Sequence, residues 1–274
     1  MQFMNNGAEM TEKVKNREVW LQIKMEENMS ILANYLAQLI KAQLNGEKPV
    51  SVPEEIQVED LIHLSCKNHM EYLVMGALLK TDGISEEIQG ILRSHVMRSI
   101  VRTTTQIMDL KEIIRRFEEK KIVNQPMKGA QMKFIYPSPE MREMSDIDIL
   151  IRYDCMDRAA EELKDMGYVL EQAIKHHDIY VKEPFMVVEA HRAMYDKTVD
   201  NNQYEYFSNF SKAILKKGYK YTYDFNDEDF YIYMIAHMAK HFYVKGCGVR
   251  NLVDIYVYSS RSSCRIMVKP PIPT

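Results

Sequence analysis

Two aspartates, Asp146 and Asp148, lie two residues apart in a stretch rich in isoleucine that continues to Ile151. In an extended strand successive side chains point to opposite faces, so the two carboxylates share one face and Ile147, Ile149 and Ile151 share the other. Isoleucines on one face can anchor such a strand to a core. Two carboxylates on the opposite face need a different explanation.

The electrostatics of this aspartate pair favour a bound cation. Side chains two apart on a strand are roughly 7 Å apart, and at an effective dielectric of about 20 two like charges at that distance repel by roughly 2 kcal/mol. The pair resists full ionisation unless it is solvated, protonated or joined by a cation. Mg²⁺ typically takes one or two carboxylates together with phosphate oxygens and water. For a bare D-x-D the alternative is a solvated strand face or a strand that ends in a turn.

A third carboxylate, Glu189, lies in the apolar stretch 185–190 and shares a strand face with Val187 and His191. If this strand lies beside the aspartate strand, Glu189 joins Asp146 and Asp148. Three acids can hold two metal ions about 3.5–4 Å apart, one activating the attacking oxygen and one binding the leaving phosphates. The alternative is a Glu and a His at an exposed strand end.

The order of these residues resembles a known active site. A Lys128-Gly129 turn after an apolar run, then Arg142, Asp146-Ile147-Asp148 and later Glu189, resembles the active-site region of nucleotidyltransferases related to DNA polymerase β. Within that superfamily it resembles the uncharacterised bacterial nucleotidyltransferase family and, more distantly, the AbiEii-type toxin nucleotidyltransferases. The resemblance covers roughly residues 122–194. One departure is Ala130 after Gly129, where the superfamily usually has Gly or Ser, so no serine hydroxyl is offered to a phosphate here.

The resemblance implies roles for the central residues. It implies that the acids bind Mg²⁺ (or Mn²⁺) on the triphosphate of a nucleotide and form the catalytic group, with the Glu189 carboxylate helping to deprotonate the acceptor hydroxyl. The acids are Asp146, Asp148 and Glu189, and the nucleotide-binding residues that it implies are Lys128, Gly129, Arg142 and Ser145. Lys128 and Arg142 would neutralise phosphate charge. Lys128 could equally be a surface lysine, and Arg142 could instead pair with Glu140 or Glu143.

Further candidates face the substrate in this interpretation: His191, His237, His241, Arg250 and Asp254. His237 and His241 lie at i, i+4 on a predicted helix and so share a face. H-x-x-x-H can bind a metal but lacks the internal Glu of a zinc protease motif, and packing is the alternative. Arg250 and Asp254 are also at i, i+4, and an intrahelical ion pair worth a few tenths of a kcal/mol is the favoured interpretation. The polar cluster 176–178 before a predicted strand is interpreted as a loop, with a ligand role as the less favoured alternative.

The function implied by the resemblance is transfer of a nucleoside monophosphate from an NTP to a hydroxyl acceptor, which could be a small molecule, a protein side chain or a tRNA end. Two other interpretations stay open. One is a nucleotide-binding or regulatory protein that keeps the fold without turnover. The other is the toxin of a toxin–antitoxin pair, which would modify a macromolecule.

The periodicity of apolar residues predicts an α+β fold, with a small mixed sheet flanked by helical regions. Helices are expected over 25–44, 58–79, 85–120, 155–166, 228–243 and 249–258, and strands over 122–127, 146–151, 168–170, 178–182 and 185–190. The corresponding organisation is an N-terminal helical region (1–120), a nucleotidyltransferase core (121–196), a C-terminal helical region (197–258) and a disordered tail (259–274).

Composition narrows the class of protein. The chain has 274 residues, 46% of them hydrophobic and 27% charged, as in an ordinary globular protein. Its net charge of −3 argues against general nucleic-acid coating. The polar N-terminus lacks the apolar core of a signal peptide, and no apolar run is long enough for a membrane span. The four cysteines are scattered without a C-x-x-C pair, which favours reduced thiols and a cytoplasmic location.

Overall fold

The chain, seen here in a computed structural model that describes residues 29–198 and 201–261, divides into two compact units. One comprises the described part of Met1–Lys67 together with Leu73–His95. The other comprises Asn68–Tyr72 and the described part of Val96–Thr274. Helices and a mixed sheet confirm the predicted α+β class.

The first unit is helical. It contains a helix over residues 29–45, α2 (Val58–Lys67), most of α3 (Glu71–Leu78) and the beginning of α4 (Glu86–Glu119). Gly46 ends the first helix with φ +73°, a conformation that glycine adopts without the strain a side chain would add. Residues 25–28 of the helix predicted over 25–44 lie outside the described residues.

The single helix predicted over 58–79 is wrong, because the chain turns between α2 and α3. His69 takes φ +51° there, which breaks the helical path. The side chain of Asn68 accepts a hydrogen bond from the backbone N–H of Val249, at 3.2 Å. Because this partner lies 181 positions away in the sequence, the local periodicity of apolar residues does not reveal the contact. The turn therefore could not be predicted from that periodicity.

The second unit is built on a five-stranded sheet in the order β1-β2-β5-β4-β3. Its strands are β1 (Asn124–Pro126), β2 (Ile147–Ile151), β3 (Val169–Ala173), β4 (His177–Lys182) and β5 (Met186–His191). β2 and β5 are parallel, and every other neighbouring pair is antiparallel. The predicted mixed sheet is therefore present, with strand ends shifted by one to three residues from the predicted ones. Short helices α5 (Gly129–Met132), η1 (Pro139–Met141) and η2 (Tyr153–Cys155) lie in the connections.

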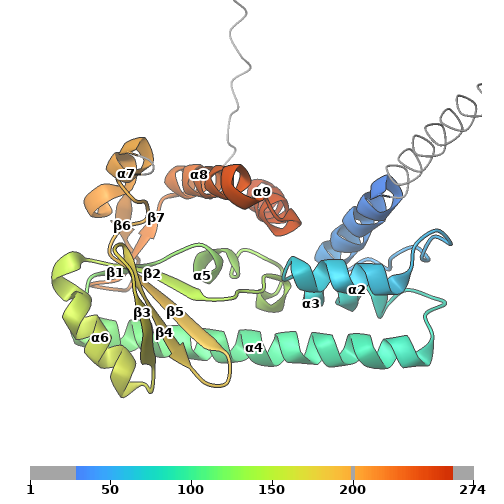
Figure 1. The fold of residues 1–274 in the computed structure, drawn as a ribbon, viewed down its shortest axis with the longest axis horizontal. Coiled ribbons are helices and arrows are strands. Elements are labelled where there is room, and N and C mark those ends of the chain that lie inside the picture. The colour runs from blue at the N-terminus through green and yellow to red at the C-terminus, as the bar shows by residue number, and fades with distance from the viewer. Residues whose placement is uncertain (1–28, 199–200, 262–274) are drawn as a thin grey trace, which may run out of the picture. The chain divides into compact units, whose positions relative to one another are not determined.

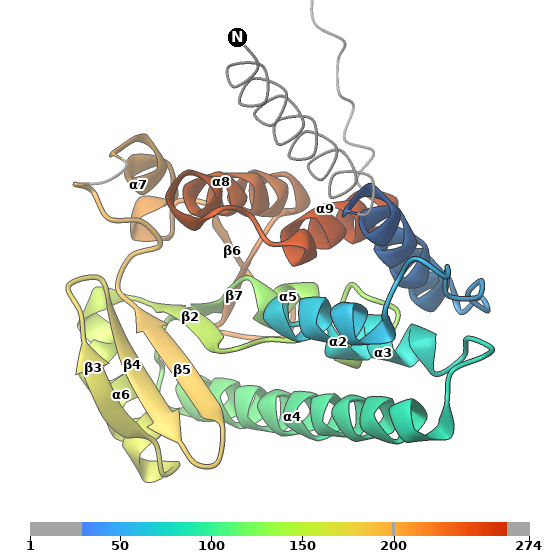
Figure 2. The ribbon, with the colours of Figure 1, turned by 45° about the vertical axis from the view of Figure 1, so that its right-hand side comes forward.

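One face of this sheet forms the hydrophobic core of the unit. Alternate residues of β2 and β5 point to that face, where α4 and α6 (Met156–Asp165) cover them (Figures 1 and 2). The buried residues include Ile147, Ile149, Ile151, Val188 and Ala190 from the strands, Ile113 and Phe117 from α4, and Ala159 and Leu163 from α6. Burial of a side chain of this size typically contributes about 1.5–3 kcal/mol, so this face holds the strands in register.

The remaining, C-terminal elements lie against the other face of the sheet and against its β1 edge. These are α7 (Asn201–Phe207), η3 (Ser208–Phe210), β6 (Ala213–Leu215), β7 (Tyr223–Phe225), α8 (Asp227–Lys245) and α9 (Val249–Arg261). Asn226 caps α8 by accepting a hydrogen bond from the backbone N–H of Asp229 at 2.8 Å. The region predicted as helical thus contains the two-stranded sheet β6-β7. Residues 259–261 of the predicted disordered tail belong to α9, and 262–274 lie outside the described residues.

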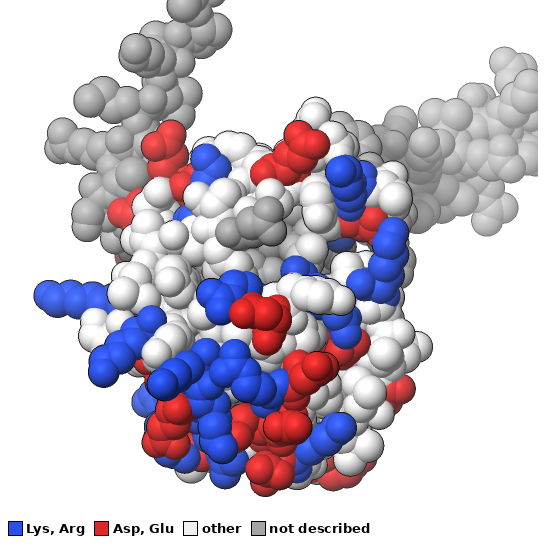
Figure 3. Space-filling view, turned by 90° about the vertical axis from the view of Figure 1, so that its left-hand side faces the viewer, with Lys and Arg blue, Asp and Glu red and all other residues white. Residues whose placement is uncertain are grey.

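The surface carries charges of both signs. On the face shown in Figure 3, acidic side chains lie directly among the lysines and arginines. Among the exposed ion pairs of the described residues, Arg115 pairs with Glu112 at 2.7 Å on α4. Among the described helices, none is both long and apolar enough to cross a membrane.

Candidate active site

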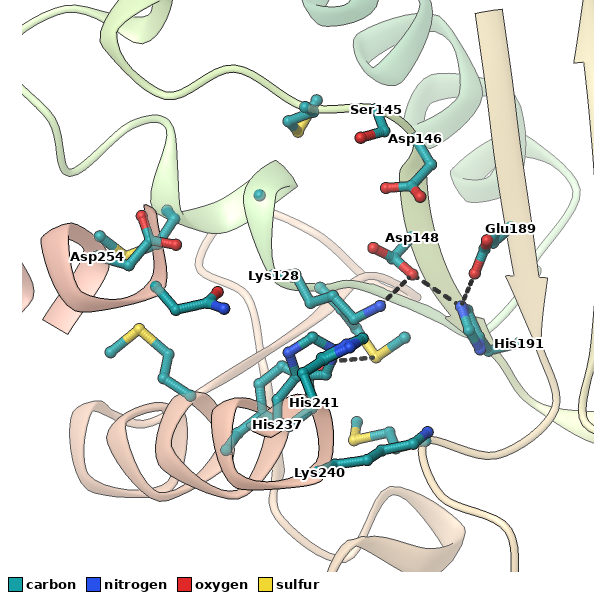
Figure 4. A pocket seen from close by; sticks show the side chains of 18 of the residues that line it. Lys128, Ser145, Asp146, Asp148, Glu189, His191, His237, Lys240, His241 and Asp254 are labelled. Atoms are coloured by element: carbon teal, nitrogen blue, oxygen red, sulfur yellow. Dashed lines mark hydrogen bonds and ion pairs between the residues drawn. The ribbon is translucent and has the colours of Figure 1, made fainter. Parts of the chain in front are cut away.

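The register of the sheet places the acids side by side. Asp148 in β2 is the direct partner of Glu189 in the parallel strand β5. Asp146 immediately precedes β2, rather than lying within it as predicted. All three acids line a cavity of about 330 Å³ on the face of the sheet opposite the core (Figure 4). Alternation therefore separates the isoleucines from the carboxylates, as the sequence predicts.

The same cavity gathers every other residue singled out from the sequence. Its lining includes Lys128, Gly129, Arg142, Ser145, His191, His237, His241, Arg250 and Asp254. They come from the turn before α5, the loop before β2, the end of β5, and helices α8 and α9.

Asp148 is the centre of the hydrogen-bond network. Its Oδ1 accepts from Lys128 Nζ at 2.7 Å and from His191 Nε2 at 2.8 Å. His191 Nε2 also lies 3.2 Å from Glu189 Oε2. Lys128 and His191 thus hold the carboxylates of adjacent strands, and Lys128 lines the cavity and is not a surface lysine.

The backbone at Lys128 is strained. Lys128 has φ +47° and ψ −117°, a conformation that costs a residue with a side chain of the order of 1–3 kcal/mol. The following Gly129 is tightly packed, because a Cβ there would lie 2.7 Å from Cγ of Met144. The turn therefore uses glycine for close packing and places the positive φ on the lysine, whose ammonium group reaches Asp148.

The local charges shift the pKa values of the acids in opposite directions. Burial and the neighbouring Asp148 charge raise the pKa of Asp146 to about 6. Burial also opposes ionisation of Asp148, but Lys128 and His191 outweigh it and hold the pKa of Asp148 below its usual range. The hydrogen bond from His191 lowers the pKa of Glu189. Lys128 and His191 thus compensate Asp148 and Glu189, whereas Asp146 is left undercompensated.

Arg142 has a partner that the sequence did not suggest. Its Nε donates to both carboxylate oxygens of Asp254, at 2.7 and 3.0 Å, and both side chains are buried. Tyr136 also donates to Asp254, at 2.7 Å. The expected alternative pairing of Arg142 with the carboxylate of Glu140 or Glu143 is therefore wrong. The phosphate-binding role of Arg142 stays a prediction.

The ion pair predicted between Arg250 and Asp254 within α9 is also wrong. Asp254 pairs with Arg142, and Arg250 Nη1 donates to the backbone carbonyl of Glu143 at 3.3 Å. Both contacts join α9 to the loop that precedes β2. This loop carries Ser145 and Asp146, so α9 determines where the first aspartate lies.

The helix α8 forms the wall of the cavity opposite the sheet. His237 and His241 face it one turn apart, with their Nε2 atoms 3.1 Å from each other (Figure 4). Burial and the nearby Lys128 charge lower the pKa of both rings. One neutral ring therefore donates to the other. Tyr233 and Lys240 on the same helix also line the cavity.

His177 is the residue of the site that the sequence interpretation missed. It was taken for part of a loop, but it begins β4 and is the direct partner of His191 in β5. Its Nε2 lies 4.0 Å from Glu189 Oε2. The sequence signal that could have revealed His177 is its position relative to the strand that follows it. A strand that begins at His177 places Ile179 beside Glu189 and His177 beside His191.

Comparison with known proteins identifies the family of the chain. A family model of uncharacterised nucleotidyltransferases matches residues 54–267, and the chain belongs to this family. No curated protein matches the chain.

Three solved structures share parts of the fold at low identity. The antibiotic-resistance factor ANT(2'')-Ia is 10% identical over 58% of this chain and 84% of its own, with a TM-score of 0.43. The lincosamide antibiotic adenylyltransferase LnuA is 16% identical over 57% and 97%, with a TM-score of 0.38. A nucleotidyltransferase-like protein from Paracoccidioides brasiliensis is 14% identical over 58% and 77%, with a TM-score of 0.38.

Proposed function

We propose that the protein transfers a nucleoside monophosphate from an NTP to a hydroxyl acceptor in the cavity between β2, β5 and α8. The observation that carries the proposal is the direct pairing of Asp148 with Glu189 across parallel strands, with Asp146 in the same cavity. A protein that only binds nucleotide has no need to hold three acids against their mutual repulsion.

The acids fit a divalent cation. Asp146, Asp148 and Glu189 offer only oxygen ligands, which Mg²⁺ and Mn²⁺ prefer. Asp146 is the acid whose charge is not compensated, as its raised pKa shows, and a cation would remove that penalty. When bound, the ion would neutralise developing charge on the phosphates and orient them.

The residues of the chain then have distinct tasks. The ammonium group of Lys128, which is hydrogen-bonded to Asp148 in the cavity, binds phosphate oxygens. The acceptor oxygen forms a bond to the α-phosphorus, the bond from that phosphorus to the bridging oxygen breaks, and pyrophosphate leaves with the electron pair. The hydroxyl proton moves to the carboxylate of Glu189. His191 holds Glu189 and Asp148 in place through its ring nitrogen. Arg142 joins Lys128 in neutralising phosphate charge, and Gly129 and Ser145 contact the nucleotide.

The test is transfer of label by the full chain. The protein is incubated with each NTP labelled at the α-phosphate, with Mg²⁺ or Mn²⁺, and with small-molecule, protein or tRNA acceptors, and labelled product and pyrophosphate are measured. We expect product with at least one combination and a loss of 10³-fold or more with Asp148→Asn, the order of effect seen when an electrostatic element of a transition state is removed.

Asp154→Asn is the matched control. Asp154 is an exposed acid paired with Arg152 at 2.6 Å, away from the cavity. It should leave transfer unchanged. Absence of transfer and of NTP binding with every divalent ion, or equal transfer by the Asp148→Asn variant, would overturn the proposal.

A further inference from the structure

Two histidines stand beside the carboxylates on the same face of the sheet. Glu189 and His191 are two apart on β5 and so share a face. His177 in β4 is the cross-strand partner of His191, which places its ring on that face as well. The His177 and His191 rings are 4.9 Å apart between centroids. Three metal-ligating side chains from two adjacent strands therefore converge at one end of the cavity.

The separations of their atoms suit one metal ion. One ring nitrogen from each histidine and one oxygen from Glu189 all lie within 4.8 Å of one another. His191 Nε2 is 3.2 Å and His177 Nε2 is 4.0 Å from Glu189 Oε2. Two ligand atoms bonded to one ion at about 2.0–2.1 Å are roughly 3–4 Å apart, depending on the coordination angle. Small side-chain adjustments would therefore suffice.

The environment of the two rings also points to a ligand. His191 is buried, and the side chain of His177 is only 13% exposed. The Nδ1 atoms of both rings are buried without a hydrogen-bond partner among the described residues. The polar contacts of both rings are thus made through Nε2 toward Glu189. His191 Nε2 also makes the hydrogen bond to Asp148 at 2.8 Å, so both rings turn their Nε2 atoms toward the carboxylates.

We propose that His177, Glu189 and His191 form a binding site for a transition-metal ion such as Zn²⁺ or Co²⁺. This inference rests on the proposed function for its place beside the nucleotide, because Glu189 belongs to both ligand sets. Imidazole ligands suit transition metals, whereas Mg²⁺ prefers an all-oxygen site. The adjacent Asp148 adds negative charge. Lys128 is an opposing cation in the same cavity, and its hydrogen bond is made to Asp148. The ion would take the place of the proton that His191 Nε2 donates to the carboxylates.

The test measures metal binding in the absence of nucleotide. The metal-free full chain is titrated with Co²⁺, whose visible absorption reports coordination by nitrogen, and Zn²⁺ or excess Mg²⁺ is then added. We expect one equivalent of Co²⁺ to bind, Zn²⁺ to displace it and Mg²⁺ to leave it in place. His177→Ala should weaken Co²⁺ binding at least tenfold. Circular dichroism and urea unfolding verify that the variant folds, and His177→Gln replaces it if it does not.

His241→Ala is the discriminating control, because the pair His237 and His241 on α8 also presents two ring nitrogens to the cavity. It should bind Co²⁺ like the unaltered chain. Absence of stoichiometric binding, equal binding by His177→Ala, or loss of binding in His241→Ala would overturn the inference. Transfer with Mg²⁺ but without Co²⁺ binding would refute this site alone, whereas Co²⁺ binding without any transfer would refute the proposed activity alone.

Discussion

The two faces of the central sheet are made by the same strands, but one face buries apolar side chains and the other brings charged side chains together. On the core face Ile147, Ile149 and Val188 are completely buried among other apolar side chains. On the cavity face their immediate neighbours Asp148 and Glu189 hold negative charge at close range. The single strand β2 therefore contributes to stability with its isoleucines and to chemistry with Asp148.

This difference teaches where the stability of the site comes from. Like charges in a cavity oppose folding, and the apolar face on the reverse side of the same strands compensates for them. The cavity face is also held from outside the sheet, through the buried pair of Arg142 and Asp254 that joins the loop before β2 to α9. Substitutions on the apolar face, among the acids and at the Arg142–Asp254 pair should therefore change the free energy of unfolding by different amounts, and not all in the same direction.

The largest effect on stability is expected where α9 holds the loop. Arg142→Met leaves Asp254 buried without its cationic partner, which should lower the free energy of unfolding by about 3–5 kcal/mol. The double variant Arg142→Met with Asp254→Asn should recover part of this loss, because no unpaired charge remains. Urea unfolding of both variants measures the difference. A loss below about 1 kcal/mol in the single variant would contradict a structural role for the pair.

Kinetics of the same variants distinguish the two roles of Arg142. If its guanidinium also binds phosphate, the KM for NTP stays raised in the double variant. If it only positions the loop, the double variant regains the KM of the unaltered chain along with its stability.

A smaller effect is expected on the core face. Ile149→Ala removes a buried side chain and leaves a cavity between β2 and the helices, which should cost about 3 kcal/mol. Because Ile149 points away from the acids, transfer activity at a temperature where the variant is folded should change less than about threefold. A loss as large as that of Asp148→Asn would show that the two faces are not independent. Unfolding curves and initial rates on one preparation provide both values.

Much of this comparison was accessible from the sequence, because it depends on local alternation. Asp148 between Ile147 and Ile149 predicts one charged and one apolar face without any knowledge of the partners. The neighbouring position of Glu189 was a condition of the hypothesis, and the register of β2 with β5 meets it.

What could not be predicted depends on contacts between distant positions. Arg142 and Asp254 are 112 residues apart, and at the sequence level each had a nearer oppositely charged neighbour with which to pair. His177 was missed for a similar reason, since its importance arises from its register with His191 and not from its own neighbours. The end of α2 near His69 likewise reflects packing and not periodicity.

The smallest expected effect on stability is at Asp146, where a substitution should stabilise the folded protein and not destabilise it. The pKa of this carboxyl rises from 3.8 to about 6 through burial and the Asp148 charge. The folded state therefore favours the protonated acid, so the unaltered chain loses stability as the pH rises from about 4 through 6. The shift corresponds to at most about 3 kcal/mol, and because the side chain is partly exposed we expect about 1–2 kcal/mol.

Asp146→Asn should remove this penalty. In EDTA the variant should be more stable than the unaltered chain by about 1–2 kcal/mol at pH 8, with the gain shrinking as the pH falls through 6 and 4 and reaching near zero by about pH 3, where the aspartate is largely protonated in both the folded and the unfolded state. Urea unfolding of the two proteins at several pH values measures this difference directly. A constant difference across this range, or a destabilised variant at pH 8, would show that Asp146 is not an undercompensated charge. Because the same substitution removes a proposed cation ligand, the gain in stability should accompany a loss of transfer, as expected where a site is selected for activity at the expense of stability.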